Sequence, residues 1–166
     1  MAIVPIADLC DENARHLASG EVRVLHPVFQ IYGKATTFSG PVVTLRLHDD
    51  NVLLRELLLT KGEGRVIVID GGGSMRCALL GGKLTQLAKN MGWAGIVING
   101  CIRDVDEINA CDIGVRALAS HPVRPGKKRI GEKSVTVYVG GTFVQEGEWL
   151  YADKDGILIS KFELSN

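Results

Sequence analysis

The fold is decided by residues 64–100, which read GRVIVIDGGGSMRCALLGGKLTQLAKNMGWAGIVING. The runs at its two ends, 64–70 and 93–100, are rich in β-branched residues, a pattern typical of strands buried on both faces of a mainly parallel sheet. The segment between them is rich in glycine and then helical from about Leu84 to about Asn90. We therefore predict a strand, helix and strand that form a right-handed crossover unit.

The flanking segments extend this α/β pattern. Upstream, periodicity predicts a helix over 5–18, strands over 28–38 and 41–48, and a helix over 51–62 that ends at its last glycines. Downstream, we expect a strand over 114–123, a basic loop over 124–133 and short antiparallel strands over 134–160, with a turn at 154–156. The prediction is one α/β domain over 1–166, with a central, mostly parallel sheet and a β-rich C-terminal third.

Composition narrows the class of protein. The chain has 166 residues, 46% of them hydrophobic, which is enough for one domain with a real core. Its 19 basic and 19 acidic residues cancel, so the net charge favours neither direct nucleic-acid binding nor an anionic membrane. No basic leader or long apolar segment is visible, and we expect a soluble cytoplasmic protein.

Cysteine and histidine do not form recognisable metal or catalytic patterns. The four cysteines lack a CxxC pair and are expected to be free and mostly buried. The four histidines occur singly, which gives little support to a zinc site or a serine triad. Lys83 and Lys89 are simpler to interpret as helix-surface residues than as Schiff-base lysines. The basic loop lacks interleaved aromatic residues, which favours a solvated loop over an RNA-binding patch.

Polar residues follow the two buried strands at corresponding positions. Asp70 and Asn99 lie at the carboxyl ends of these strands, where open α/β sheets bind ligands. The segment VINGCIRDVDEINACDIG at 97–114 begins at the same edge and brings Arg103, Asp104 and Glu107 there. Two interpretations stay open: the acids complement the dipole at a helix start, or they form a metal and substrate site.

The chemistry of the Arg103 and Asp104 pair suits a keto acid. Aspartate is a hard oxygen ligand for Mg²⁺ or Mn²⁺, and the guanidinium offers a fixed fork to a carboxylate or an enolate oxygen. If a helix starts at 104–107, Asp104 and Glu107 share a face while Asp106 points elsewhere. Glu107 then either reaches the metal through a water or orients Arg103.

Two glycine clusters are candidate ligand loops. The first, DGGGS at 70–74, follows a strand and its Ser74 is placed to cap a helix, but it matches neither GxGxxG nor GxxxxGK[ST], so nucleotide binding is not favoured. The second, LLGGKL at 79–84, precedes a helix whose free amides can bind a carboxylate. The alternative for Gly81 and Gly82 is a tight turn or a helix kink.

The central motif from 66 to 108, DIGVRALASHPV at 112–123 and LYADKDGILIS at 150–160 together resemble the family of the regulator of ribonuclease E activity A, the RraA-like family. That family also contains metal-dependent 4-hydroxy-4-methyl-2-oxoglutarate aldolases. The resemblance spans nearly the whole chain and is closer to the small, plant-type members. It implies a swivelling β/β/α domain in a ring-shaped homotrimer, sometimes paired into a hexamer, with active clefts between neighbouring subunits.

The resemblance also implies roles for particular residues. Asp104 holds a divalent metal, Mg²⁺ or Mn²⁺, and Arg103 contacts the substrate and stabilises a pyruvate enolate. The amides around the glycine turn bind the substrate carboxylate, at positions Gly81, Gly82, Lys83 and Leu84. Metal-active members often carry an acid at the position of Gly82, whereas regulatory members lack the aspartate that this chain keeps at 104.

The expected function is therefore that of a carbon–carbon lyase. It would cleave 4-hydroxy-4-methyl-2-oxoglutarate to pyruvate and decarboxylate oxaloacetate as a side activity, because both reactions pass through the same enolate. The alternative is a non-catalytic trimer that binds and inhibits a ribonuclease or an RNA helicase. A methyltransferase activity is not favoured, because no nucleotide-binding glycine pattern is present.

Overall fold

Two strands of the predicted crossover unit form the middle of the sheet. In the computed structural model, which describes residues 4–164, β4 (Val66–Asp70) and β6 (Gly95–Ile102) pair in parallel, and Asp70 lies opposite Asn99. The helix between them, α4, spans Gly82–Asn90 and so begins two residues before the expected Leu84. A short strand that the sequence did not predict, β5 (Ala78–Leu80), precedes this helix and also pairs with β6 in parallel.

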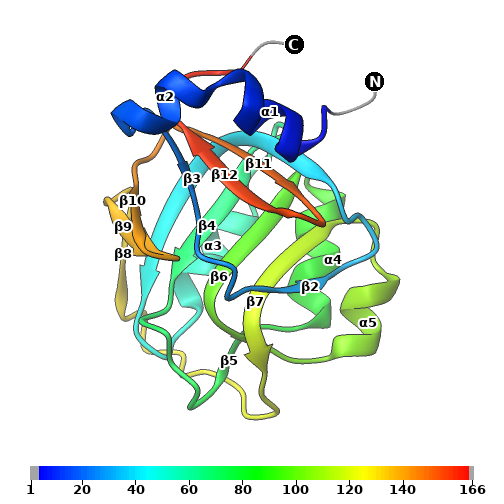
Figure 1. Ribbon diagram of the computed structural model, residues 1–166. Helices are drawn as coiled ribbons and strands as arrows, with labels where there is room; N and C mark the ends of the chain where they lie inside the picture. The colour runs from blue at the N-terminus through cyan, green and yellow to red at the C-terminus, as the bar shows by residue number, and fades with distance from the viewer. Residues whose placement is uncertain (1–3, 165–166) are drawn as a thin grey trace.

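The remaining strands extend this centre into a large curled sheet (Figure 1). Within residues 4–164 the strand order is β1-β12-β11-β3-β4-β6-β7-β2, with β5 beside β6 and β8 beside β3, and β9 and β10 form a separate hairpin. Strands β3, β4, β6 and β7 pair in parallel, and the outer strands pair antiparallel. The strands not yet bounded are β1 (Val22–Val24), β2 (Gln30–Tyr32), β3 (Phe38–Leu47), β7 (Gly114–Ser120), β8 (Gly131–Lys133), β9 (Val137–Val139), β10 (Thr142–Val144), β11 (Trp149–Asp153) and β12 (Gly156–Ser160).

The sheet is buried on both faces, which explains the continuous apolar runs. Ile67 and Ile69 of β4 pack in a cluster with α3 (Val52–Leu58), α4 and α5 (Val105–Ala110). Val66 and Val68 point to the opposite face and pack with strands β9 to β12. All four side chains are fully buried. This arrangement is the mixed α/β architecture expected, with a β-rich C-terminal third that folds back against the parallel strands.

The N-terminal region departs from prediction at two places. The helix expected over 5–18 is broken into α1 (Ile6–Glu12) and α2 (Ala14–Ser19), which lie over β11 and β12 (Figure 1). Asn13 leaves helical geometry between them and its side-chain amide donates to Leu9 O at 2.8 Å. The strand expected over 28–38 is limited to β2, because Gly33 turns the chain at φ +85°.

The C-terminal region follows the expected pattern of short antiparallel strands. β11 and β12 form a hairpin in which Asp153 lies opposite Gly156, so the predicted turn at 154–156 is confirmed. None of the helices in residues 4–164 has the length and hydrophobicity needed to span a bilayer.

Candidate active site

The site lies where parallel strands end. Gly81 and Gly82 follow β5, and Arg103 and Asp104 follow β6. Because β5 and β6 are parallel neighbours, their carboxyl ends deliver both segments to the same edge of the sheet. The backbone amide of Arg103 donates to Leu80 O at 2.9 Å, which extends the pairing of β5 with β6 by one residue.

Asp104 has an unusual backbone conformation. It is the residue before α5 and adopts the left-handed region at φ 59° and ψ 51°, which few residues other than glycine, asparagine and aspartate tolerate. This turn directs the side chain back to α4, where Asp104 Oδ2 accepts the Gly82 N–H at 2.8 Å. Strained backbone of this kind clusters at ligand sites, and here it orients a carboxylate.

The two glycines make room for two carboxylates. A Cβ added at position 82 would collide with the Glu107 carboxylate, and one added at Gly81 would come within 2.9 Å of Asp104 Oδ2. Asp104 and Glu107 therefore both lie against the start of α4, although Asp104 precedes α5 in the left-handed conformation and is not part of the helical face that the sequence predicted. The glycine pair is more than a tight turn, since side chains there would displace both acids. The Glu107 carboxylate occupies the space that a side chain at position 82 would need.

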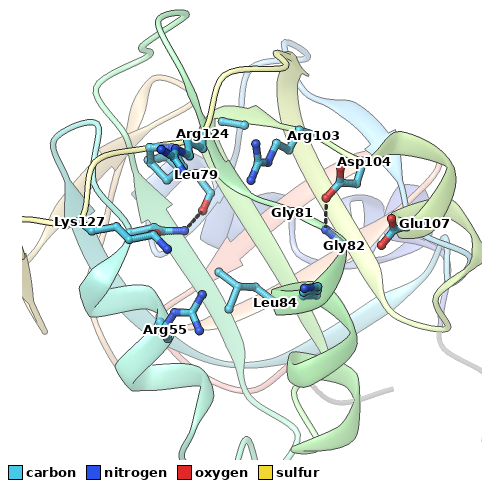
Figure 2. A pocket seen from close by; sticks show the side chains of 14 residues that line it. Arg55, Leu79, Gly81, Gly82, Leu84, Arg103, Asp104, Glu107, Arg124 and Lys127 are labelled. Atoms are coloured by element: carbon cyan, nitrogen blue, oxygen red, sulfur yellow. Dashed lines mark hydrogen bonds between the residues drawn. The ribbon is translucent and has the colours of Figure 1, made fainter.

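These residues line one pocket of about 250 Å³ (Figure 2). Arg55 comes from α3, and Arg124 and Lys127 come from the loop between β7 and β8. In the figure, these three lie on one side of the pocket, and Asp104 and Glu107 lie on the other. The lining residues are Asn51, Arg55, Ala78, Leu79, Gly81, Gly82, Lys83, Leu84, Arg103, Asp104, Glu107, Arg124, Pro125 and Lys127.

The pocket concentrates positive charge in a chain that has no net charge. Five of its lining side chains are arginine or lysine, and only two are acidic. Within residues 4–164 none of the five forms an ion pair, whereas Arg46, Arg76 and Arg129 outside the pocket each bind a carboxylate. Unpaired cations around a concave surface favour an anionic ligand.

Asn51 lines the pocket from the start of α3. The side chain is 8% exposed, and its Nδ2 donates to Leu79 O at 3.1 Å. This bond ties the β3 to α3 connection to β5 and leaves the amide oxygen of Asn51 as an acceptor at the pocket. The sequence did not single out this residue, because an isolated asparagine before a helix is an ordinary capping residue.

The structure brings all of the predicted site residues together in one pocket. It differs from the prediction in the backbone amides that are available to bind a substrate. Arg103, Asp104, Glu107, and 81–84 all line the pocket. The Gly82 amide is already bound by Asp104, so it is not free for a substrate carboxylate as expected. The amides of Lys83 and Leu84 lie in the first turn of α4, where helical amides have no partner within the helix.

Other polar positions at this edge have structural partners instead. Asp70 Oδ1 accepts the Gly72 N–H at 2.8 Å and the Asn99 side-chain amide at 3.3 Å, so this pair shapes the 70–74 loop. Ser74 begins no helix, and its Oγ accepts the Arg76 N–H at 3.2 Å. Asp106 is outside the pocket lining, as its predicted direction requires.

None of the four cysteines lines this pocket. Cys77, Cys101 and Cys111 are buried and unpaired, and burial raises the pKa of each. For Cys77 the pKa reaches about 11, first through desolvation and then through the nearby charge of Asp49. The prediction of free, mostly buried thiols is confirmed.

The donor set fits a divalent cation that keeps most of its water ligands. Asp104 uses one carboxylate oxygen for the Gly82 amide and keeps the other, and Glu107 lies beside it. Among the described residues no group of three or more His, Cys, Asp or Glu side chains is placed to hold a metal. Two hard oxygen donors with waters suit Mg²⁺ or Mn²⁺, while structural zinc sites take four protein ligands.

The fold and pocket define an α/β protein with a positively charged pocket at the carboxyl ends of its parallel strands. The RraA-like family, described as Aldolase/RraA, matches residues 6–159, and the chain belongs to this family.

Relatives and solved structures of different described functions match almost the whole chain. A protein of Arabidopsis thaliana that carries the proposed name 4-hydroxy-4-methyl-2-oxoglutarate aldolase 3 is 64% identical over 99% of both chains. A solved structure from Geobacillus kaustophilus, described as an S-adenosylmethionine:2-dimethylmenaquinone methyltransferase, is 42% identical with a TM-score of 0.92, over 98% of this chain and 99% of that one. The RNA-processing inhibitor RraA from Thermus thermophilis is 39% identical with a TM-score of 0.92, over 99% and 97%. The expected family and fold are confirmed.

Proposed function

We propose that the protein is a divalent-metal-dependent aldolase that cleaves 4-hydroxy-4-methyl-2-oxoglutarate into two molecules of pyruvate. The observation that carries this proposal is the Arg103 and Asp104 pair, held at the start of α4 in a cationic pocket. The name of the 64% identical Arabidopsis relative supports the same reaction.

Asp104 and Glu107 are proposed to hold Mg²⁺ or Mn²⁺, with Glu107 acting directly or through a water. A cation bound there would act as a Lewis acid on the keto oxygen of the substrate. Asp104 is suited to this role because the Gly82 amide and its own backbone conformation fix one orientation of its carboxylate before any ligand arrives.

Arg103 is proposed to stabilise the oxyanion that develops during cleavage. Its backbone is fixed by pairing with Leu80, and its side chain is half-buried and donates to Pro122 O at 3.4 Å. A preorganised guanidinium beside an enolate oxygen lowers the energy of the transition state without reorganisation at the moment of reaction. The free amides of Lys83 and Leu84 are proposed to bind the carboxylate next to the keto group.

Oxaloacetate decarboxylation is the proposed side activity, since it produces the same pyruvate enolate. The test is pyruvate release from the hydroxy-keto diacid and from oxaloacetate, with and without a chelator, on wild type and Asp104→Asn. Metal-dependent release that the variant loses supports the proposal. A purified protein that makes no pyruvate with any divalent metal contradicts it.

A second candidate is a non-catalytic regulator that binds and inhibits a ribonuclease of the RNase E type or an RNA helicase. The 39% identity to the RNA-processing inhibitor from Thermus thermophilis favours it. The test is an RNA-cleavage assay with added protein. Inhibition that survives in Arg103→Gln, together with no pyruvate release by wild type, would favour this candidate over the aldolase.

Assembly as a homotrimer, or as a hexamer of paired trimers, is part of the proposal. An active cleft between neighbouring subunits would allow an acidic side chain of the neighbouring subunit, or a metal-bound water, to act as the general base. Sedimentation velocity of the purified protein tests the assembly directly.

A further inference from the structure

Three cations at one end of the pocket have no role in the chemistry proposed so far. Arg55, Arg124 and Lys127, the distal trio, line the side opposite Asp104 and Glu107 (Figure 2). Within the described residues none of the three forms an ion pair. Their side chains are exposed to the pocket and solvent. Three neighbouring positive charges without a counter-charge repel one another, and an anion bound among them removes that cost.

The loop that carries Arg124 and Lys127 is fixed rather than free. The Asp50 carboxylate, 1% exposed, accepts the backbone amides of Lys128 and Arg129, and its other oxygen accepts the Val52 amide. Further backbone bonds join Gly126 to 49–51 on both sides. The loop is thus anchored to the start of α3, the helix that carries Arg55.

An ion pair beside the pocket, between Arg129 and Glu56, does not involve the distal trio. Arg129 binds the Glu56 carboxylate through Nε at 2.9 Å and Nη2 at 3.1 Å. Glu56 follows Arg55 directly in α3, yet it pairs with Arg129 outside the pocket. Glu56, the acid next to Arg55 in the sequence, therefore neutralises Arg129. Among the described residues, the three cations that face the pocket stay without an ion-pair partner.

We infer that the distal trio binds the second carboxylate of the substrate and makes the pocket specific for 2-keto acids with a remote carboxylate. This inference rests on the proposed function, which places the keto acid end at Asp104 and Arg103. The pocket has a volume of about 250 Å³, and the trio lies on the side opposite Asp104, so a diacid bound with its keto acid end at Asp104 would direct its second carboxylate toward the trio. Arginine forks and a lysine ammonium are the usual partners of a carboxylate in such sites.

The trio also distinguishes the two reactions of the proposed enzyme. In aldol cleavage the bond between C3 and C4 breaks, the C4 hydroxyl loses its proton to a base, and the electron pair goes to the enolate. The remote carboxylate keeps its charge and leaves on the second pyruvate. The trio therefore binds it equally well in the substrate and in the transition state, and this binding lowers KM.

In oxaloacetate decarboxylation the remote carboxylate is the group that leaves. Its C3–C4 bond breaks, its charge passes to the enolate, and neutral CO₂ departs. Cations bound to this carboxylate stabilise the substrate more than the transition state, which opposes the reaction. The trio thus favours aldol cleavage over decarboxylation.

The test compares Arg124→Gln and Lys127→Gln with Lys128→Gln, a matched control whose side chain is outside the pocket lining. The substrates are the hydroxy-keto diacid, its monoacid analogue with a methyl group in place of the remote carboxylate, and oxaloacetate. Loss of one charge-assisted hydrogen bond predicts a fall of about 10- to 100-fold in kcat/KM for the diacid. The monoacid should change less than about threefold, and kcat for oxaloacetate should not fall. The control should match wild type.

Binding gives a readout that does not depend on turnover. Calorimetry with Mg²⁺ present should show 2-oxoglutarate binding at least about tenfold tighter than 2-oxobutyrate, and Arg124→Gln should remove the difference. If this preference is seen without any pyruvate release, the proposed reaction fails while the distal site stands. Equal binding of both acids, equal loss of diacid and monoacid cleavage in Arg124→Gln, or displacement of 2-oxoglutarate by equimolar inorganic phosphate would overturn the inference.

Discussion

Replacing Arg103 by glutamine removes the guanidinium proposed to face the enolate oxygen. A unit charge about 4 Å from another contributes about 4 kcal/mol at the effective dielectric of a partly exposed site. Losing a preorganised oxyanion donor in enzymes costs about 3 kcal/mol. Because Arg103 is half-buried, we take the lower figure, which corresponds to a fall of about 150-fold in kcat/KM.

The assay is pyruvate release from the hydroxy-keto diacid, followed by coupled reduction to lactate. Arg103→Lys keeps a charge but loses the fork, and we expect it to recover only part of the activity. Arg76→Gln is the control, because Arg76 binds Asp49 outside the pocket, and it should remain within twofold of wild type. An Arg103→Gln enzyme that melts normally and keeps a third or more of the wild-type kcat/KM would refute the role of this guanidinium.

Four further predictions concern Gly82, Asp50 and Cys77. Gly82→Asp should reduce Mn²⁺ affinity because its side chain collides with Glu107, and adding Glu107→Ala, which removes the colliding side chain while the introduced aspartate supplies a carboxylate, should restore part of it; equal affinity in both variants would contradict this. Asp50→Ala should lose about 2 kcal/mol of unfolding free energy in urea titration, since it leaves three backbone amides without an acceptor; an unchanged midpoint would contradict this. Cys77, with its pKa raised to about 11, should react with iodoacetamide at pH 8 about 100-fold more slowly than an ordinary thiol, and after the half-buried Cys10. The same raised pKa predicts that Cys77 favours folding below pH 9 and that this contribution is lost as the pH rises to about 11.

The fold was predictable where burial dictates residue type. The stretches 66–69 and 96–98 are apolar at every position because these strands are packed on both faces, and this pattern identified a parallel sheet. Strand β5 was missed because three residues give too short a pattern and its pairing with β6 is a tertiary contact. The helix break at Asn13 was missed because local apolar spacing continues across it.

The candidate site was predictable only on the side that adjoins the crossover unit. Arg103 and Asp104 follow a strand that the pattern identified, and the glycine pair precedes the helix of the predicted crossover unit, so the predicted topology placed both at the same edge of the sheet. Arg124 and Lys127 belong to a loop expected to be merely solvated. That loop is exposed, but two of its backbone amides donate hydrogen bonds to the buried Asp50 carboxylate, and these bonds hold the loop at the pocket. A carboxylate that accepts hydrogen bonds from amides 78 and 79 residues away in the sequence leaves no local sequence pattern from which this contact could be predicted.

The most direct test of the central claim is Mn²⁺ binding to wild type and Asp104→Asn. Asparagine also tolerates the left-handed conformation at φ 59°, so this variant removes the charge while the backbone can keep its turn. We predict that wild type binds one Mn²⁺ per chain and that Asp104→Asn binds it at least about tenfold more weakly, with loss of metal-dependent pyruvate release. Equal Mn²⁺ affinity in the two proteins would contradict the account.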